Sequence, residues 1–329
     1  MESQSPLNQK DYIRYYFVLL LDIPAQKEQL RKWQQLRGDS SITPEMREGI
    51  QNSLGRVLRL RSGCVRLFKS FGSGGGRGQY HQLILDRLRT DAERRRYEAL
   101  TACVPRLLHF SDLVVAYSPA TVGPSDDWNV WALFSMLASL CVVMPAWLAQ
   151  GIPVRGGICI GVGTEADTVG FYGPALAEAH YLESEVAGYP RVVVSAGLRD
   201  FIRFRPPESG GPADGFVRIG FELCRSMIAE DPDGNTIVDY LGVGGHELLA
   251  GDGNLAQAQQ QAVDGSSKFV AEECQRFALA AENAPAESAP PESARKLAER
   301  YRQLQNYFDS RRSVWADSAD RSTPGGRGT

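Results

Sequence analysis

Residues Tyr15–Leu21 read YYFVLLL, and Asp22-Ile23-Pro24 follows them directly. An unbroken aromatic and aliphatic run of this length is typical of a central strand that is buried on both faces. A carboxylate at the end of such a strand is costly unless it is paired, solvated or bound to a cation. Asp22 is therefore a candidate functional residue as well as the end of a strand.

A second aspartate occupies a similar position. Leu107–Tyr117 reads LLHFSDLVVAY, and two apolar arms around a short polar centre predict a β-hairpin with Asp112 in the middle. On adjacent strands, Asp22 and Asp112 could hold a pair of Mg²⁺ or Mn²⁺ ions, which activate an attacking oxygen and stabilise charge on a phosphate. The alternative is that both are turn and cap residues, for which Asp is common, and spacing alone favours that alternative.

The rest of the chain alternates between strand and helix patterns, which predicts an α/β (α+β) domain with a single sheet. Further strands are expected at residues 155–161, 191–195, 216–222 and 237–241. Helices are expected at residues 25–37, 43–60, 83–100, 130–149 and 174–187. The Gly-rich segment 69–78 is expected to be a flexible loop, and residues 231–235 to form a turn.

The segment Val130–Ala149, VWALFSMLASLCVVMPAWLA, has no charged residue and is long enough to cross a membrane. Ser135, Ser139 and Pro145 dilute its hydrophobicity, and no Lys/Arg cluster flanks it. A helix packed inside a protein can also be apolar all round. We therefore expect a buried core helix and no membrane attachment. A membrane-anchored signalling protein is the alternative.

Composition narrows the class of protein. The 329 residues are 43% hydrophobic and 23% charged, which excludes collagen-like, fully disordered and disulfide-dense proteins. The net charge of −3 disfavours a nucleic acid polymer as partner. Six scattered cysteines and four histidines argue against a structural zinc site. Scattered cysteines and a polar N-terminus without a signal-peptide pattern predict a cytoplasmic protein.

The order of these motifs resembles the class III nucleotidyl cyclases. In that family an early strand ends in the first metal-binding Asp, matched here by Asp22, and a hairpin carries the second, matched by Asp112 in Phe110-Ser111-Asp112. A strand like Arg155–Gly161 follows, and then a helix that opens with Gly-x-x-Val-Asn and runs on to Arg-Leu-Glu. The matching segment Gly173–Glu183 reads GPALAEAHYLE. The resemblance covers about residues 12–200.

Within that family the chain is most similar to the bacterial pyrimidine cyclases of the Pycsar anti-phage systems. The phrases FSD, RGGI-x-x-G, YGPAL-x-EA-x-x-LE, YPRVVVS and DYL occur here in that order, and YRQLQNY follows near the C-terminus. The resemblance implies a ferredoxin-like cyclase domain with a mostly antiparallel sheet flanked by helices. It also implies a head-to-tail homodimer with active sites shared across the interface.

The chain departs from the purine cyclases at three positions. Ala177 and Tyr181 stand where those enzymes place a transition-state Asn and Arg, and Leu108 stands where adenylate cyclases place the base-reading Lys. Leucine cannot donate a hydrogen bond, so purine recognition by that device is lost. The enzyme either recognises another base or is inactive, and the retained aspartate pair favours another base. Candidate residues for binding a pyrimidine nucleotide are Arg106, His180 and Tyr181.

By resemblance, the reaction is attack of the ribose 3′-oxygen on the α-phosphorus of a nucleoside triphosphate, with loss of pyrophosphate. Asp22 and Asp112, helped by the Ile23 carbonyl, would hold two divalent ions, Mn²⁺ or Mg²⁺. Arg155 is the candidate for stabilising charge on the α-phosphoryl oxygens.

UTP is the favoured substrate, giving cyclic UMP for a cyclic-nucleotide-sensing effector in anti-phage defence. Three alternatives stay open: a cytidylate cyclase, an inactive cyclase-like nucleotide-binding module, and an adenylate or guanylate cyclase, which Leu108 disfavours.

Four regions are expected along the chain. A cyclase domain spans residues 10–279, and a Pro/Ala/Glu/Ser-rich linker spans residues 280–293. A polar C-terminal helix spans residues 294–315, and a disordered tail spans residues 316–329.

Overall fold

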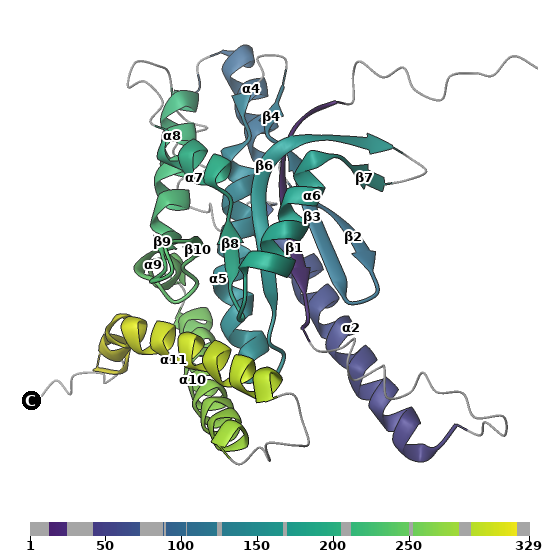
Figure 1. The fold of residues 1–329 in the computed structure, drawn as a ribbon. Helices are drawn as coiled ribbons and strands as arrows, with labels where there is room; N and C mark the ends of the chain where they lie inside the picture. Colours follow the sequence, from purple (N-terminus) through teal and green to yellow (C-terminus); the bar gives the residue numbers. More distant parts are fainter. Residues whose placement is uncertain are drawn as a thin grey trace, which may run out of the picture.

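A mixed α/β arrangement with one mostly antiparallel sheet runs through the computed structural model (Figure 1). The structure describes residues 13–24, 42–72, 88, 90–102, 104–123, 127–166, 170–204, 212–249, 253–282 and 291–320. The helix expected at residues 25–37 lies outside these ranges, as do residues 321–329 of the expected tail.

The main sheet has the strand order β2-β3-β1-β6-β8-β10-β9, and β7 pairs with the far end of β6. Only the β6–β8 pair within it is parallel. Its strands are β1 (Arg14–Asp22), β2 (Arg106–Phe110), β3 (Leu113–Pro119), β6 (Arg155–Ala166), β7 (Gly170–Tyr172), β8 (Val192–Val194), β9 (Ile228–Glu230) and β10 (Thr236–Val238). A separate two-stranded ribbon consists of β4 (Thr121–Val122) and β5 (Asp127–Trp128).

The first half of the domain has β-α-β-β-α-β connectivity. After β1 come α2 (Pro44–Gly72) and α4 (Asp91–Thr101), then the β2–β3 hairpin, α5 (Val130–Ala149) and β6. Both β3 and β6 pair with β1 in antiparallel register. The expected hairpin and its place beside β1 are therefore confirmed.

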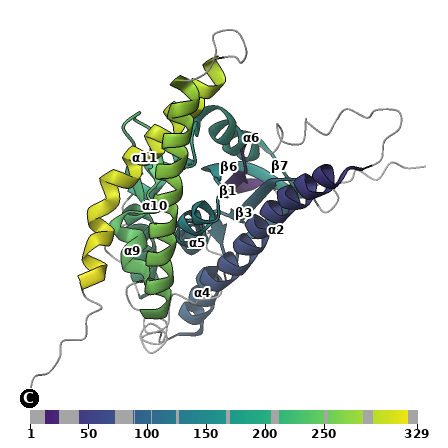
Figure 2. The ribbon, with the colours of Figure 1, turned by 90° about the horizontal axis from the view of Figure 1, so that it is seen from below.

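Strand β1 is buried on both faces, as its sequence predicts. Phe17, Leu19 and Leu21 belong to a large core beneath α2 and α5, whereas Tyr16 and Leu20 belong to a smaller core on the opposite face. That second face is covered by α6 (Pro174–Tyr181) and its continuation η2 (Leu182–Val186), one wide π-helical turn. Figure 2 shows α2 and α5 on one side of β1 and β6, with α6 on the other.

Helix α5 is a core helix. It is the one described helix long and apolar enough to cross a membrane, and 89% of its apolar window is buried inside the domain. Pro145 has no N–H, so the carbonyl of Cys141 one turn earlier loses its helical donor. The side chain of Gln259 donates to that carbonyl at 2.9 Å. This burial is that of a core helix rather than of a membrane span.

The remaining helices complete the large core and the C-terminal layer. They are α7 (Ala196–Arg203), α8 (Pro212–Ser226), α9 (Val243–Leu249), α10 (Gly253–Glu282) and α11 (Pro291–Asp320). Helix α10 packs on α5 and α11 packs on α10 (Figures 1 and 2).

Helix α11 is longer than the sequence predicts. The predicted linker includes residues 291–293 and the predicted tail includes residues 316–320, but all of them are helical. Near its C-terminal end the helix is attached to the domain by Trp315, whose indole N–H donates to the carbonyl of Leu241 at 2.9 Å. Pro291 at the first position suits a helix start, because proline there loses no helical hydrogen bond. Residues 280–282 of the expected linker belong to α10, and residues 283–290 lie outside the described ranges.

The strand predicted at residues 216–222 is wrong, because these residues lie within α8. Their β-branched and aromatic side chains suggested a strand, but the buried residues Phe216, Val217, Phe221 and Cys224 follow helical spacing.

Two further boundaries differ from the prediction. Helix α4 begins at Asp91, where Thr90 and Glu93 form a capping box, and residues 83–87 and 89 of the predicted helix lie outside the described ranges. Residues 69–72 of the expected loop continue α2, and residues 73–78 lie outside the described ranges.

Two glycines of β6 let neighbouring backbone approach closely. A Cβ atom on Gly157 would lie 2.4 Å from the carbonyl oxygen of Ala179 and 2.6 Å from the Cβ of Leu182. A Cβ atom on Gly156 would lie 2.5 Å from the carbonyl oxygen of Leu20. Helix α6 and η2 can therefore rest directly on the backbone of β6.

We expect Gly157→Ala to destabilise the protein by about 1–3 kcal/mol, the usual cost of overpacking a filled site. The matched control is Gly197→Ala in α7, where the nearest heavy atom to the new Cβ would be 3.9 Å away. Urea denaturation followed by circular dichroism measures both variants. Equal stabilities for the two variants would show that α6 does not rest on β6 as described.

Candidate active site

Asp22 and Asp112 meet at one end of the sheet. Leu21 pairs with Val114 in the register between β1 and β3, so Asp22 is level with Leu113, and Asp112 is the preceding residue. Ser111 turns the chain between β2 and β3 with φ of +53°, in the left-handed region. This tight turn places Asp112 beside the end of β1.

Arg155 and Glu183 join this pair of aspartates. Arg155 begins β6 and pairs in register with Asp22. Its Nη2 lies 3.6 Å from Oδ2 of Asp22, and its Nε donates to Oε1 of Glu183 at 2.5 Å. The three side chains are only 16%, 19% and 3% exposed for Asp22, Arg155 and Glu183. The site therefore contains three carboxylates and one guanidinium, partly removed from water.

This crowding raises the pKa of Asp22 to about 7. Burial is the largest cause, followed by repulsion from Glu183 and then from Asp112, whereas Arg155 acts in the opposite direction. One guanidinium does not balance three ionised carboxylates. A bound cation would favour the ionised form of Asp22.

Asp22 and Asp112 are the residues of this cluster that could hold a divalent ion. In the part of the chain that the structure describes, no group of three His, Cys, Asp or Glu side chains is arranged to hold a metal ion. Mg²⁺ in phosphoryl-transfer sites is commonly held by only one or two carboxylates together with phosphate oxygens of the substrate. The side chain of Ile23 is buried in the core, so this residue could contribute only its backbone carbonyl.

Glu183 was not selected from the sequence, although it is the last residue of the quoted GPALAEAHYLE segment. The sequence gives no local signal for it, because Glu183 stands in a polar stretch with Ser184 and Glu185. Its role depends on the close contact of η2 with β6, which the sequence pattern does not reveal.

The predicted nucleotide-binding residue Arg106 lies away from Asp22 in the same chain. Arg106 begins β2 and forms an ion pair with Glu165 of β6. Glu165 is ten residues from Arg155, which corresponds to roughly 30 Å along an extended strand. Arg106 itself is level with Tyr117 of β3 and Val18 of β1, four residues before Asp22. Its side chain is directed to Glu165 and not to the aspartate pair.

His180 and Tyr181 lie at the end of α6 with exposed side chains, and Tyr181 is 56% exposed. Glu183 follows within two residues but points inward and is buried. Successive helical residues differ in direction by about 100°. Glu183 therefore faces β6, while His180 and Tyr181 face solvent.

Leu108 makes apolar contacts. It packs against the smaller core, and its side chain occupies the space beside Gly170 at the start of β7. The side chain at this position of β2 therefore contributes shape and not a hydrogen bond.

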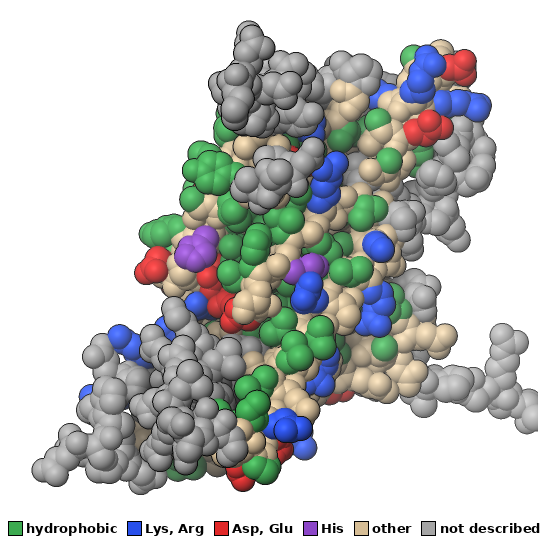
Figure 3. Space-filling view, turned by 90° about the vertical axis from the view of Figure 1, so that its right-hand side faces the viewer, with side chains coloured by type: hydrophobic (Ala, Val, Ile, Leu, Met, Phe, Trp, Pro, Cys, Tyr) green, Lys and Arg blue, Asp and Glu red, His purple; other side chains and the backbone are tan. Residues whose placement is uncertain are grey.

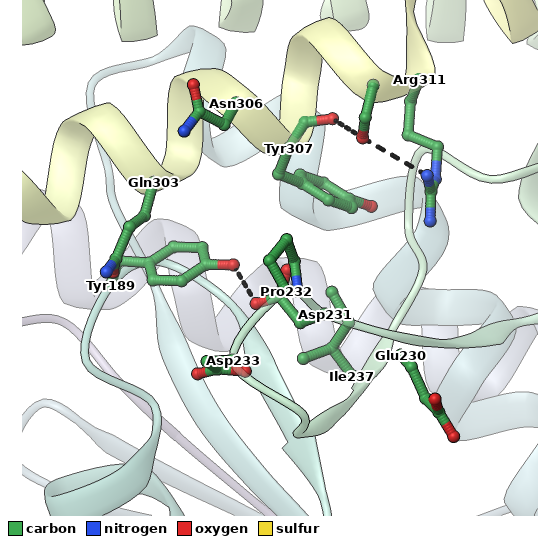
Figure 4. A pocket seen from close by; sticks show the side chains of 11 residues that line it. Tyr189, Glu230, Asp231, Pro232, Asp233, Ile237, Gln303, Asn306, Tyr307 and Arg311 are labelled. Carbon is green, nitrogen blue, oxygen red and sulfur yellow. Dashed lines mark hydrogen bonds between the residues drawn. The ribbon is translucent and has the colours of Figure 1, made fainter.

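A separate pocket of about 360 Å³ lies between α11 and the turn that joins β9 and β10 (Figure 4). Tyr189 donates a hydrogen bond to Asp231 there, and the buried Arg191 pairs with Asp231 and Asp233. Hydrogen bonds from Arg191 and Asn235 lower the pKa of Asp233 to about 2, although burial opposes them. Each of these charged side chains has a partner. These ion pairs and hydrogen bonds hold the predicted turn at residues 231–235 in place, so we do not take this pocket as the candidate active site.

Comparison with protein-family models, with curated proteins and with solved structures finds no match for this chain.

We expect Asp22→Asn to stabilise the metal-free protein by about 1 kcal/mol, because it removes a charge from a crowded site. The folded pKa lies near 7 and the ordinary value is 3.8. Asp22 therefore destabilises the fold increasingly between pH 4 and pH 7, and fully above pH 7. The gain from the variant should be larger at pH 8 than at pH 5 in thermal melting.

Asp200→Asn on α7 is the control, because that side chain is 66% exposed and pairs with Arg199. Addition of Mn²⁺ should raise the melting temperature of the wild type more than that of Asp22→Asn. If Mn²⁺ shifts both proteins equally, Asp22 is not a ligand.

Proposed function

We propose that the protein is a pyrimidine nucleotide cyclase that converts UTP into cyclic 3′,5′-UMP and pyrophosphate. The observation that carries the proposal is the convergence of Asp22 and Asp112 from the neighbouring strands β1 and β3. They converge in a sheet whose β-α-β-β-α-β connectivity is ferredoxin-like. The order of motifs that resembles the class III cyclases supports the same conclusion.

The proposed reaction forms a bond between the ribose 3′-oxygen and the α-phosphorus and breaks the bond from that phosphorus to the bridging oxygen of pyrophosphate. The 3′-hydroxyl proton is released. Two Mg²⁺ or Mn²⁺ ions held by Asp22, Asp112 and the Ile23 carbonyl would lower the pKa of that hydroxyl and neutralise triphosphate charge. Arg155 orients Asp22 and would donate to an α-phosphoryl oxygen.

Recognition of the base would come from a second copy of the chain in a head-to-tail homodimer. Arg106 pairs with Glu165, and the side chains of His180 and Tyr181 face solvent, so a partner subunit is the arrangement in which they could reach the nucleotide. The face that includes β2 carries a patch of hydrophobic side chains beside Lys and Arg residues (Figure 3). Exposed aromatic residues such as Phe110 on β2 and Tyr172 on β7 suit an interface.

A catalytically inactive nucleotide-binding module is the second candidate. Ala177 and Tyr181, both exposed on α6, stand where purine cyclases place a transition-state Asn and Arg. Neither can donate as a guanidinium does. The cost of keeping Asp22 ionised in a crowded site favours an active enzyme instead.

As a cyclase, the protein would act in the cytoplasm as the synthase of an anti-phage defence system. Its cyclic nucleotide would be received by a separate effector.

The first test is incubation of the purified protein with Mn²⁺ and each of ATP, GTP, CTP and UTP, with products identified by mass spectrometry. We expect cyclic UMP from UTP. Cyclic CMP alone would establish a cytidylate cyclase instead. Metal-dependent binding of UTP without any cyclic product would favour the inactive module.

We expect Asp22→Ala and Asp112→Ala each to reduce cyclic nucleotide formation by at least a thousandfold, because each would remove a metal ligand. Circular dichroism and size-exclusion chromatography should show the fold and the dimer unchanged. Asp200→Ala is again the matched control and should keep full activity. Product formation by either aspartate variant at the wild-type rate would contradict the two-metal site.

A further inference from the structure

A second cavity adjoins the candidate active site. It measures about 760 Å³, and Pro24 and Arg155 form part of its wall. Pro24 follows β1 two residues after Asp22, and Arg155 pairs with Asp22 itself. The opposite walls come from α2, α10 and α11. A ligand bound at Asp22 could therefore extend into a space that the C-terminal helices help to enclose.

The lining of this cavity is strongly basic. Its five cationic side chains are Arg56, Arg155, Arg276, Lys296 and Arg300, and its one acidic side chain among the lining residues described is Glu273. Glu273 already forms an ion pair with Arg276. Arg155 is held by Asp22 and Glu183.

The positive charges of Arg56 and Arg300 are not balanced by an ion pair. Among the residues that the structure describes, no acidic side chain forms an ion pair with either of them. Partial burial and the positive charge of Arg155 lower the pKa of Arg300. Two guanidinium groups without an acidic ion-pair partner thus line one cavity, and a multivalent anion there would offset their charge and the repulsion between Arg300 and Arg155.

We propose that this cavity binds the polyphosphate tail of the nucleotide held at Asp22 and Asp112, with Arg300 of α11 and Arg56 of α2 as its ligands. The inference rests on the proposed function for the identity of the nucleotide. Beyond the proposed function, it makes helix α11 part of the substrate-binding site, through Arg300. A charged tail of three phosphates suits a cavity of this size. One guanidinium group can donate two hydrogen bonds to the oxygens of a phosphate.

The test uses inorganic tripolyphosphate as the probe, with the full-length protein and EDTA, measured by isothermal titration calorimetry. Without metal ions, binding depends on the cationic side chains and not on the aspartate pair. We expect Arg300→Gln and Arg56→Gln each to weaken tripolyphosphate binding at least tenfold. We expect UTP to compete with tripolyphosphate in the wild type.

Arg302→Gln is the matched control on the same helix, because Arg302 is 62% exposed, pairs with Glu299 and does not line the cavity. Its affinity for tripolyphosphate should stay within twofold of the wild type. Melting temperatures of all variants check that the fold is kept. Asp22→Asn should bind tripolyphosphate at least as tightly as the wild type, because it removes a negative charge from the neighbourhood.

Two results would overturn the proposal: wild-type protein that does not bind tripolyphosphate, or binding that Arg300→Gln and Arg56→Gln leave unchanged. Simultaneous binding of UTP and tripolyphosphate would also overturn it, because the two would then occupy different sites. Competition that is sensitive to Arg300 supports the proposal even if no cyclic product forms. In that case only the cyclase activity would be refuted.

Discussion

Helix α6 and its continuation η2 lie against the bare backbone of β6, and the geometry of the candidate site depends on that contact. Gly157 leaves room for the carbonyl of Ala179, so the helix descends far enough for Glu183 to reach Arg155. Arg155 is in turn held opposite Asp22 by the β1–β6 register. A side chain at position 157 would lift the helix and remove Glu183 from the cluster. Wide π-helical turns such as η2 often occur at functional sites, where they redirect a side chain.

The resulting cluster is unfavourable for a purely structural role. A fold that needed only a cap at the end of β1 could use an asparagine there at no electrostatic cost. Instead, burial and two further carboxylates oppose ionisation of Asp22. Perturbed groups of this kind concentrate at functional sites, because the binding of a ligand or the chemical step offsets the cost. Beside the pocket under α11, by contrast, the buried Arg191 is fully paired with Asp231 and Asp233.

Local patterns in the sequence were enough to predict β1, the β2–β3 hairpin and α5, since each has a long apolar run with clear ends. The pairing of Asp22 with Asp112 came from the order of motifs along the chain and not from local spacing. Residues 216–222 show the limit, because their side chains suit a strand and only packing against α5 makes them helical. Glu183 and the separation of Arg106 from Asp22 depend on register and on contacts between distant elements. Such contacts are not encoded in local spacing.

The C-terminal helices belong to the same structural unit as the sheet. Asp239 follows β10 and is 8% exposed, and both side chains that donate to it, Tyr307 and Arg311, come from α11. Tyr307 also accepts a hydrogen bond from the backbone N–H of Leu241. Without α11 these groups would lose their partners, and a buried carboxylate without donors is strongly disfavoured. These hydrogen bonds also hold in place the neighbouring part of α11, which carries Arg300. The polar contacts that attach the helix to the sheet therefore also hold a cationic side chain over the cavity beside Asp22.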